Sequence, residues 1–173
     1  MPFEDFEVFR DYHRIGERIF TSGQPAPDQF TIMAKAGIEI VINLSPSNGL
    51  DALPDEGDLV RAAGMGYIHI PVEWQNPQKS ELEKFLVLFS KHDYHYIFVH
   101  CARNMRASAF VFLYRMIVNQ EPREKCLTDL HAIWKPDAVW QSFIERMLTE
   151  VKKPADSRDW DIEWSGYTTF KPK

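Results

Sequence analysis

The sequence has few cysteines, no long apolar run and no excess of basic residues. Its two cysteines, Cys101 and Cys126, exclude a disulfide framework, and no apolar run is long enough to cross a bilayer. The formal charge of -5 argues against nucleic acid as the main partner, because proteins that bind it carry a basic surface. The histidines lack the spacing of metal ligands. We therefore expect no metal, no other cofactor and no membrane partner.

The two ends of the chain carry different signals. The N-terminus is acidic and lacks the apolar segment of a signal peptide, so we expect a cytoplasmic location, where a free thiol stays reduced. Residues 1–13 place Phe3, Phe6 and Phe9 at helical spacing and are expected to form a short docking arm. Residues 152–173 are too aromatic for a solvated tail, so we expect them to pack on the domain or on a partner.

Apolar runs that alternate with amphipathic segments predict the fold class. Residues 1–151 are expected to form a single α/β domain, with a mainly parallel central sheet of about four to five strands and helices on both faces. The expected strands are residues 38–44, 67–72 and 96–99, and residues 14–20 are expected to form a strand or a hairpin edge. The expected helices are residues 28–36, 55–63, 80–91, 107–118, 121–134 and 136–151. In such a sheet, ligands bind beyond the carboxyl ends of the strands.

Local signals predict where some of these helices begin and end. Asp28 is expected to cap the first helix, and Gly37 to end it. Ser80, with Glu83 three residues later, is expected to form a capping box. These signals set the boundaries of the segments that connect the strands.

The most informative stretch runs from His100 to Ser108, between a buried strand and a buried helix. Backbone amides at a helix start have no intrahelical acceptor, and together with the helix dipole they attract an anion. A cysteine at the floor of such a cradle is favoured as the thiolate, which is a nucleophile. Arg106 can reach over the mouth with a planar, bidentate fork, and Ser108 can offer its hydroxyl to the sulfur.

The order His100, Cys101, a short loop and Arg106 resembles the cysteine-dependent phosphatases, both tyrosine-specific and dual-specificity. Thr-Ser-Gly-Gln-Pro at residues 21–25 and Val-Ile-Asn-Leu at residues 41–44 narrow the resemblance. They are similar to the small bacterial phosphatase-like family related to the β-lactamase-hydrolase-like phosphatases. The resemblance implies a cysteine-phosphatase-like fold and a phosphomonoester substrate, on a phosphorylated small molecule or a phosphoprotein, that reacts through a phosphocysteine at Cys101.

The resemblance also implies roles for individual residues. Arg106 binds the phosphate, His100 orients the loop, and Ser108 assists the sulfur. The remaining loop positions that would hold phosphate are Ala102, Arg103, Asn104, Met105 and Ala107.

The general acid of the related phosphatases is an Asp on the loop after the preceding strand. Trp74 stands at that position here, so the adjacent Glu73 is the candidate acid, and Asp51, Asp55 and Asp58 are further acids within reach of the site. Strand alternation would turn Glu73 away from the cleft.

Two departures from the phosphatase pattern keep other functions open. Only four residues separate Cys101 from Arg106, where the phosphatase pattern has five, and this shorter loop also fits rhodanese-type sulfurtransferases. Asn104 stands where those proteins commonly have Gly, and Asn tolerates a left-handed backbone. The alternatives are therefore sulfurtransferase or redox use of Cys101, or a catalytically weak phosphate-binding pseudophosphatase module.

Simpler interpretations of the same residues also stay open. Cys101 can be an inert buried residue, as Cys126 is expected to be, and Arg106 can be a structural ion-pair partner. Arg103, Arg106 and Arg115 are expected to form a local basic patch that attracts an anionic substrate. A homodimer is the oligomer that the sequence leaves open.

Overall fold

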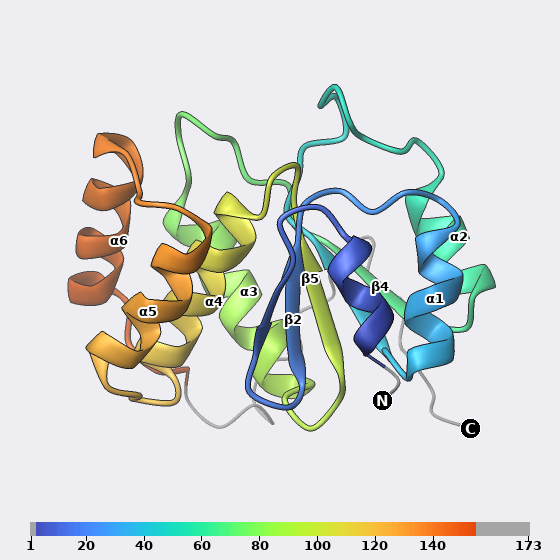
Figure 1. Ribbon diagram of the computed structural model, residues 1–173. Coiled ribbons are helices and arrows are strands. Elements are labelled where there is room, and N and C mark those ends of the chain that lie inside the picture. The colour runs from blue at the N-terminus through green and yellow to red at the C-terminus, as the bar shows by residue number, and fades with distance from the viewer. Residues whose placement is uncertain (1–2, 155–173) are drawn as a thin grey trace.

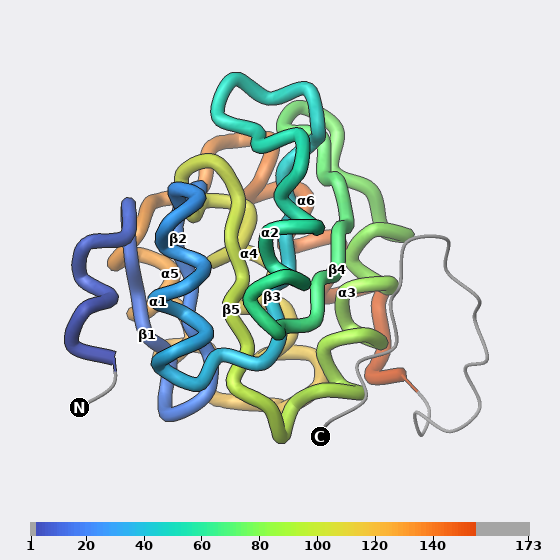
Figure 2. Tube along the Cα trace, turned by 90° about the vertical axis from the view of Figure 1, so that its right-hand side faces the viewer, coloured from blue at the N-terminus to red at the C-terminus, as the bar shows by residue number. Residues whose placement is uncertain are grey.

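A computed structural model describes residues 3–154 as a five-stranded sheet with helices on both faces (Figure 1). Figure 2 shows the strands side by side in the order β1-β2-β5-β3-β4. They are β1 (His13–Ile15), β2 (Ile19–Ser22), β3 (Ile40–Asn43), β4 (Gly66–His69) and β5 (Ile97–His100). Only β1 is antiparallel to its neighbour, so the sheet is mixed and mostly parallel. The predicted fold class is confirmed.

The helices form one layer on each face of the sheet (Figures 1 and 2). On one face lie the 3-10 helix η1 (Glu4–Val8), α1 (Gln29–Ala36) and α2 (Glu56–Ala62). On the other face lie α3 (Lys79–Lys91) and α4 (Met105–Ile117), with α5 (Arg123–Ile133) and α6 (Ala138–Glu150) packed against α4. The alternation of strands and helices in the sequence therefore produces the three-layer arrangement that parallel strands require.

The strands divide the core into two hydrophobic clusters because successive side chains point to opposite faces. In β5, Ile97 and Val99 belong to the cluster under α3 and α4, whereas Phe98 belongs to the cluster under η1, α1 and α2. The strand β3 has the same pattern and is buried along its whole length. This alternation also sends the two residues that follow Val99 to opposite faces.

The phenylalanines of the N-terminal arm dock on the sheet. Phe6 and Phe9 are buried in η1 and directly after it, and both pack against Phe98 with ring centroids 5.8 and 5.3 Å apart. Phe6 also contacts Phe20 of β2 at 5.6 Å. The arm thus covers the face of β2 and β5 that the longer helices leave uncovered (Figure 1).

Residues 14–20, expected as a strand or a hairpin edge, belong to two antiparallel strands, β1 and β2, that are joined by a turn at residues 16–18. Asp28 and Gly37 flank α1 as predicted, but two predicted capping interactions were wrong. The side chain of Asp28 makes no capping hydrogen bond, and Gln29 accepts one from the Ala26 amide instead. The capping interaction of α3 joins the Glu81 carboxylate to the Gln78 amide at 2.8 Å, in place of Ser80 and Glu83.

The strand predicted over residues 67–72 ends at His69 because Pro71 has no amide hydrogen to donate to the ladder. The backbone nevertheless stays paired at Ile70 and Val72, whose amides donate to Asn43 and Leu44.

The prediction for the aromatic tail falls mostly on residues 155–173, which lie outside the described residues, so it stays a prediction. Among the helices of residues 3–154, none is both long enough and apolar enough to span a bilayer.

Gly37 ends α1 with φ at +102°, a conformation that a side chain disfavours. We predict that Gly37→Ala lowers the free energy of unfolding by about 1 to 2 kcal/mol, because Ala is strained in the left-handed region. Gly49→Ala is the matched control, since Gly49 has no positive φ and a new Cβ would only touch the Pro46 carbonyl at 3.4 Å. Urea unfolding of the two variants measures the difference, and equal stabilities would contradict the argument.

Candidate active site

The cysteine loop leaves the carboxyl end of β5, the central strand of the sheet. Because β5 is parallel to both of its neighbours, the segments that follow β2, β3 and β5 emerge at the same edge. Figure 1 shows this edge at the top, with the loops after β3 and β4 beside the turn that leads into α4. The turn consists of residues 101–104, so the sheet brings all three predicted motifs to one place.

Asn104 makes the turn from strand to helix possible. Its φ is +63°, the left-handed conformation that Asn adopts more readily than other non-glycine residues. Its fully buried side chain donates to the Asp11 carbonyl at 2.6 Å and to the Thr21 hydroxyl at 3.0 Å. Asn104 therefore turns the loop and also ties it to the β1–β2 hairpin.

The Thr-Ser-Gly-Gln-Pro motif supports the loop from behind. The Gln24 amide donates to the Ala102 carbonyl at 3.2 Å, and the Cys101 amide lies 3.4 Å from the Ser22 carbonyl. At Gly23 a Cβ atom would lie 2.8 Å from the Ala102 carbonyl oxygen, so only glycine fits without a shift of the backbone. The motif is thus a structural support for the cysteine loop.

His100 forms a fully buried contact with a carboxylate. Its Nε2 lies 2.6 Å from Oε1 of Glu56, and Oε2 of Glu56 accepts a hydrogen bond from Gln24 at 2.7 Å. Burial alone would raise the pKa of Glu56, but the positive charge of His100 and the hydrogen bonds from His100 and Gln24 outweigh it and lower that pKa. The contact therefore holds Glu56 ionised and fixes the orientation of the imidazole.

The sequence analysis missed Glu56, although the sequence contained a signal for it. The two buried residues of α2 are Glu56 and Val60, which are four positions apart and share one face of the helix. A carboxylate on the apolar stripe of a short helix needs a buried partner. His100 is that partner, because the alternation along β5 directs it to the α1 and α2 side of the sheet.

The same alternation directs Cys101 to the α4 side, where its side chain joins the cluster under α3 and α4. Cys101 is 1% exposed and lies directly before the turn into α4. The first three residues of α4 are Met105, Arg106 and Ala107, and their amides have no acceptor within the helix. The thiol is thus adjacent to the positive end of the helix dipole.

Arg106 is half-buried at the helix start and is held by neutral groups. One terminal nitrogen donates to the Val72 carbonyl at 2.8 Å, and the guanidinium carbon lies 5.9 Å from the centre of the Trp74 ring. Its Nε is buried and has no hydrogen-bond partner among the described residues. The residue therefore brings a positive charge to the loop, and no carboxylate within residues 3–154 neutralises it.

Ser108 does not donate to the sulfur in this structure, contrary to the prediction. Its hydroxyl donates to the Met105 carbonyl at 3.1 Å, one turn earlier in the helix, and accepts from the Trp134 indole at 3.2 Å. This arrangement is a common one for serine within a helix, because its hydroxyl can reach a preceding carbonyl. Ser108 here connects α4 to a cluster of tryptophans.

The segment after β4 supplies an indole next to Arg106. Trp74 packs against Trp134 and Trp140 with ring centroids 5.3 and 5.4 Å apart, and its carbonyl accepts from the Trp140 indole at 3.0 Å. Glu73 is exposed, whereas Val72 and Trp74 on either side of it pack toward the core. The predicted alternation thus turns Glu73 away from the core that contains Cys101.

The predicted basic patch of Arg103, Arg106 and Arg115 does not form. Arg103 lies on the rim of the loop and pairs with Asp11 at 3.3 Å. Arg115 lies three helical turns from the loop, near the other end of α4, where Glu121 and Asp129 bind it. Distance along the helix separates these residues, and only Arg103 and Arg106 lie near Cys101.

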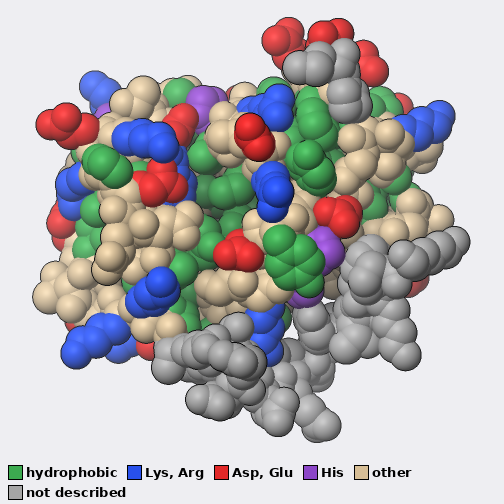
Figure 3. All heavy atoms as spheres, turned by 90° about the horizontal axis from the view of Figure 1, so that it is seen from below, with side chains coloured by type: hydrophobic (Ala, Val, Ile, Leu, Met, Phe, Trp, Pro, Cys, Tyr) green, Lys and Arg blue, Asp and Glu red, His purple; other side chains and the backbone are tan. Residues whose placement is uncertain are grey.

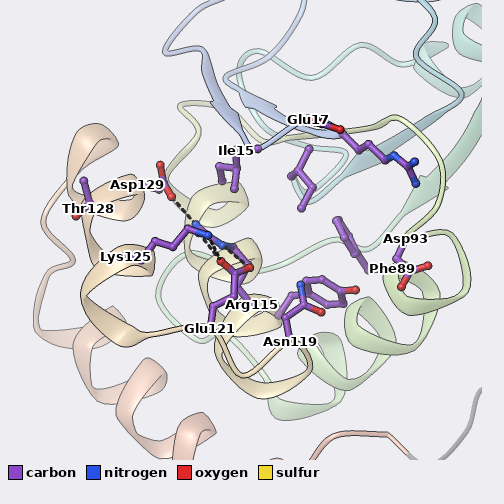
Figure 4. A pocket seen from close by; sticks show the side chains of 14 residues that line it. Ile15, Glu17, Phe89, Asp93, Arg115, Asn119, Glu121, Lys125, Thr128 and Asp129 are labelled. Atoms are coloured by element: carbon purple, nitrogen blue, oxygen red, sulfur yellow. Dashed lines mark hydrogen bonds and ion pairs between the residues drawn. The ribbon is translucent and has the colours of Figure 1, made fainter.

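Arg115 borders a cleft of about 710 Å³ at the opposite end of the sheet (Figure 4). Its guanidinium makes hydrogen bonds of 2.5 to 3.1 Å to the two carboxylates, and the bond from Arg115 helps lower the pKa of Glu121 to about 2. Figure 3, which views this end from below, shows hydrophobic side chains surrounded by charges of both signs. Glu121 and Asp129 compensate the charge of Arg115 within this cleft, whereas Arg106 has no carboxylate partner among the described residues.

The fold and the site together define a class of protein, an α/β domain with a Cys–Arg loop between the central strand and the next helix. A family profile described as "DSP-PTPase phosphatase fused to NAD+ Kinase" matches residues 11–146. The chain therefore belongs to the DSP-PTPase-like phosphatase family, and the predicted resemblance is confirmed.

Individual relatives agree with this assignment. The chain is 29% identical over 117 residues to the beta-lactamase hydrolase-like protein of Xylella fastidiosa (strain Temecula1). The matched segment covers 64% of this chain and 26% of that protein. The chain thus spans about a quarter of the length of the curated relatives it matches. Whatever the rest of those proteins does is outside the similarity.

Solved structures show the same fold. A DUF442 protein from Shewanella putrefaciens CN-32 superposes with a TM-score of 0.78 at 34% identity, covering 87% of this chain and 99% of that one. The core catalytic domain of the PP-IP phosphatase SIW14 from S. cerevisiae superposes with a TM-score of 0.65 over 79% of this chain and 85% of that one. At 17% identity the second likeness concerns the fold alone.

The contact between Glu56 and His100 yields a prediction about stability and pH. Because folding lowers the pKa of Glu56, its ionised form stabilises the folded state above its ordinary pKa of 4.5. We predict that Glu56→Gln lowers the free energy of unfolding at pH 7 by an amount on the order of 2 kcal/mol. The difference from the parent protein shrinks as the pH falls from about 4.5 through the lowered pKa.

Denaturant unfolding at several pH values measures this effect. Asp58→Asn is the control, because Asp58 lies on the same helix in an exposed pair with Arg61 and contributes little. A penalty for Glu56→Gln that is independent of pH would contradict the assignment of an ionised Glu56.

Proposed function

We propose that the protein is a cysteine-dependent phosphatase that hydrolyses a phosphorylated small molecule or phosphoprotein through a phosphocysteine at Cys101. The thiolate attacks phosphorus, the bond from phosphorus to the leaving oxygen breaks, and water then hydrolyses the phosphocysteine. Arg106 and the amides at the start of α4 bind the equatorial oxygens, because charge develops there in the transition state. The loop residues Ala102, Arg103 and Asn104 complete the phosphate site.

The observation that carries this proposal is the state of Arg106. A cation that is half-buried without a carboxylate partner is costly, and its buried Nε lacks even a neutral acceptor. Arg115 shows how this chain satisfies a structural arginine, with two carboxylates and three hydrogen bonds. An anion bound over Cys101 would supply to Arg106 what Glu121 and Asp129 supply to Arg115.

His100 acts as a positioning residue in this proposal. Its side chain lies on the opposite face of β5 from Cys101, where Glu56 holds it. It therefore anchors the end of the strand from which the loop begins, and it does not itself touch the phosphate.

We predict that Cys101→Ser abolishes hydrolysis of para-nitrophenyl phosphate and that Arg106→Lys lowers kcat/KM by about 100- to 1000-fold, because the bidentate donor is lost. Cys126→Ser is the matched control, since Cys126 is equally buried but lies in α5, away from the loop. Release of para-nitrophenolate measures the rate. Equal loss of activity in both cysteine variants would contradict the proposal.

A second candidate function is sulfur transfer at the same cysteine. The observation that favours it is the short turn of residues 101–104, which the left-handed Asn104 closes, together with Trp74 at the position of the general acid. A persulfide on Cys101 needs a thiolate and nearby positive charge but no carboxylic acid. Thiocyanate formation from thiosulfate and cyanide, lost in Cys101→Ser, would identify this function.

A third outcome separates catalysis from binding. If neither reaction occurs, but inorganic phosphate raises the melting temperature of the parent protein and not of Arg106→Gln, the site is a phosphate-binding module.

A further inference from the structure

We infer that the substrates are phosphate compounds whose leaving group departs as a stable anion, such as aryl phosphates, acyl phosphates or phosphoanhydrides. Phosphates of aliphatic alcohols are then poor substrates. This inference rests on the proposed phosphatase function and narrows its substrate class. It follows from the side chains that lie near Cys101 and Arg106 in the structure.

The first observation is that the indole ring of Trp74 lies beside Arg106. Trp74 is fixed by ring contacts to Trp134 and Trp140 and by the hydrogen bond from Trp140 to its carbonyl. The Arg106 guanidinium lies against its ring and donates to Val72, two residues before it. A leaving group on this side of the phosphate meets the Trp74 ring, which has no acidic proton to give.

The second observation concerns Glu73, the carboxylate next to that wall. It lies between two residues that face the core, and its own side chain is exposed. Its charge reaches the start of α3: burial chiefly raises the pKa of Glu81, and the charge of Glu73 raises it further. Glu81 in turn binds the Gln78 amide. The side chain of Glu73 is therefore exposed to solvent, whereas the sulfur of Cys101 is buried.

The third observation is that three other acids near this edge, Glu56, Asp11 and Asp51, have partners of their own. Glu56 lies behind β5 and uses both oxygens on His100 and Gln24. Asp11 pairs with Arg103, and Asp51 pairs with Arg10 at 3.1 Å. Within residues 3–154, Arg106 has no carboxylate partner and Cys101 no hydrogen bond to an acid.

The reaction balances without a general acid when the leaving group is a weak base. The bond from Sγ of Cys101 to phosphorus forms, the P–O bond breaks, and the oxygen departs with the electron pair as a phenolate, carboxylate or phosphate. Water then attacks phosphorus, the thiolate leaves with the S–P electron pair, and the proton from water passes to solvent. An alkoxide is too basic to leave in this way, and a positioned acid would contribute about 100- to 10,000-fold to its departure.

The test is a series of substituted phenyl phosphates of graded phenol acidity, with phosphoserine and acetyl phosphate as the alkyl and acyl members. We predict that kcat/KM falls steeply as the phenol becomes less acidic, and that phosphoserine lies at least about 100-fold below the most reactive aryl phosphate. The same series is measured for Glu73→Gln. If kcat/KM depends on phenol acidity with the same slope in the parent protein and in Glu73→Gln, the result supports the inference.

Two results would overturn the inference while leaving the phosphatase function intact. One is a flat series, with all esters hydrolysed within about tenfold of one another, since only proton donation removes the dependence on the leaving group. The other is a selective loss in Glu73→Gln for the less acidic phenols and for phosphoserine, which would identify Glu73 as the acid. A parent protein that hydrolyses no member of the series overturns the phosphatase function and this inference together.

Discussion

The buried contact between His100 and Glu56 connects three segments that are far apart in the sequence. It joins the end of the central strand to the first turn of α2, and Gln24 adds the segment after β2. A buried carboxylate is stable only if hydrogen-bond partners replace the water that it has lost. Here both carboxylate oxygens have partners, so the carboxyl end of β5 has one well-defined position from which the cysteine loop starts.

The alternation of side chains along β5 then places the supporting residue, His100, and the candidate nucleophile, Cys101, on different faces of the sheet. His100 and Cys101 are neighbours in the chain, but their side chains lie on opposite faces of the sheet. The contact between His100 and Glu56 therefore holds the strand from the α1 and α2 side, while the thiol and the start of α4 face the other cluster. Asn104 and Gly23 allow the tight path between the two, one by its left-handed backbone and the other by its lack of a side chain.

The half-buried Arg106 and the buried Arg115 lie near opposite ends of α4 and have different partners. Arg115, at one end of the helix, is neutralised by two acids and stabilises the packing of α5 against α4. Arg106, at the other end, has a carbonyl and an aromatic ring for partners. The unbalanced positive charge of the described site lies at the end where the helix dipole also favours an anion. Phosphoryl transfer and persulfide formation at a cysteine both need such a positive charge. The two reactions differ in the group that leaves the atom attacked by the thiolate.

The sequence by itself determined the alternation of strands and helices after β2, the α/β class, the strand–cysteine–helix junction and the tolerance of Asn104 for a left-handed turn. These features follow from local periodicity and from the backbone preferences of single residues, so they need no knowledge of distant neighbours. Only the tertiary structure decided that Glu56 meets His100, that Ser108 donates to Met105 and that Arg115 belongs to another cleft. Those outcomes depend on which segments the sheet brings together and on the face each side chain occupies, and neither follows from spacing along the chain.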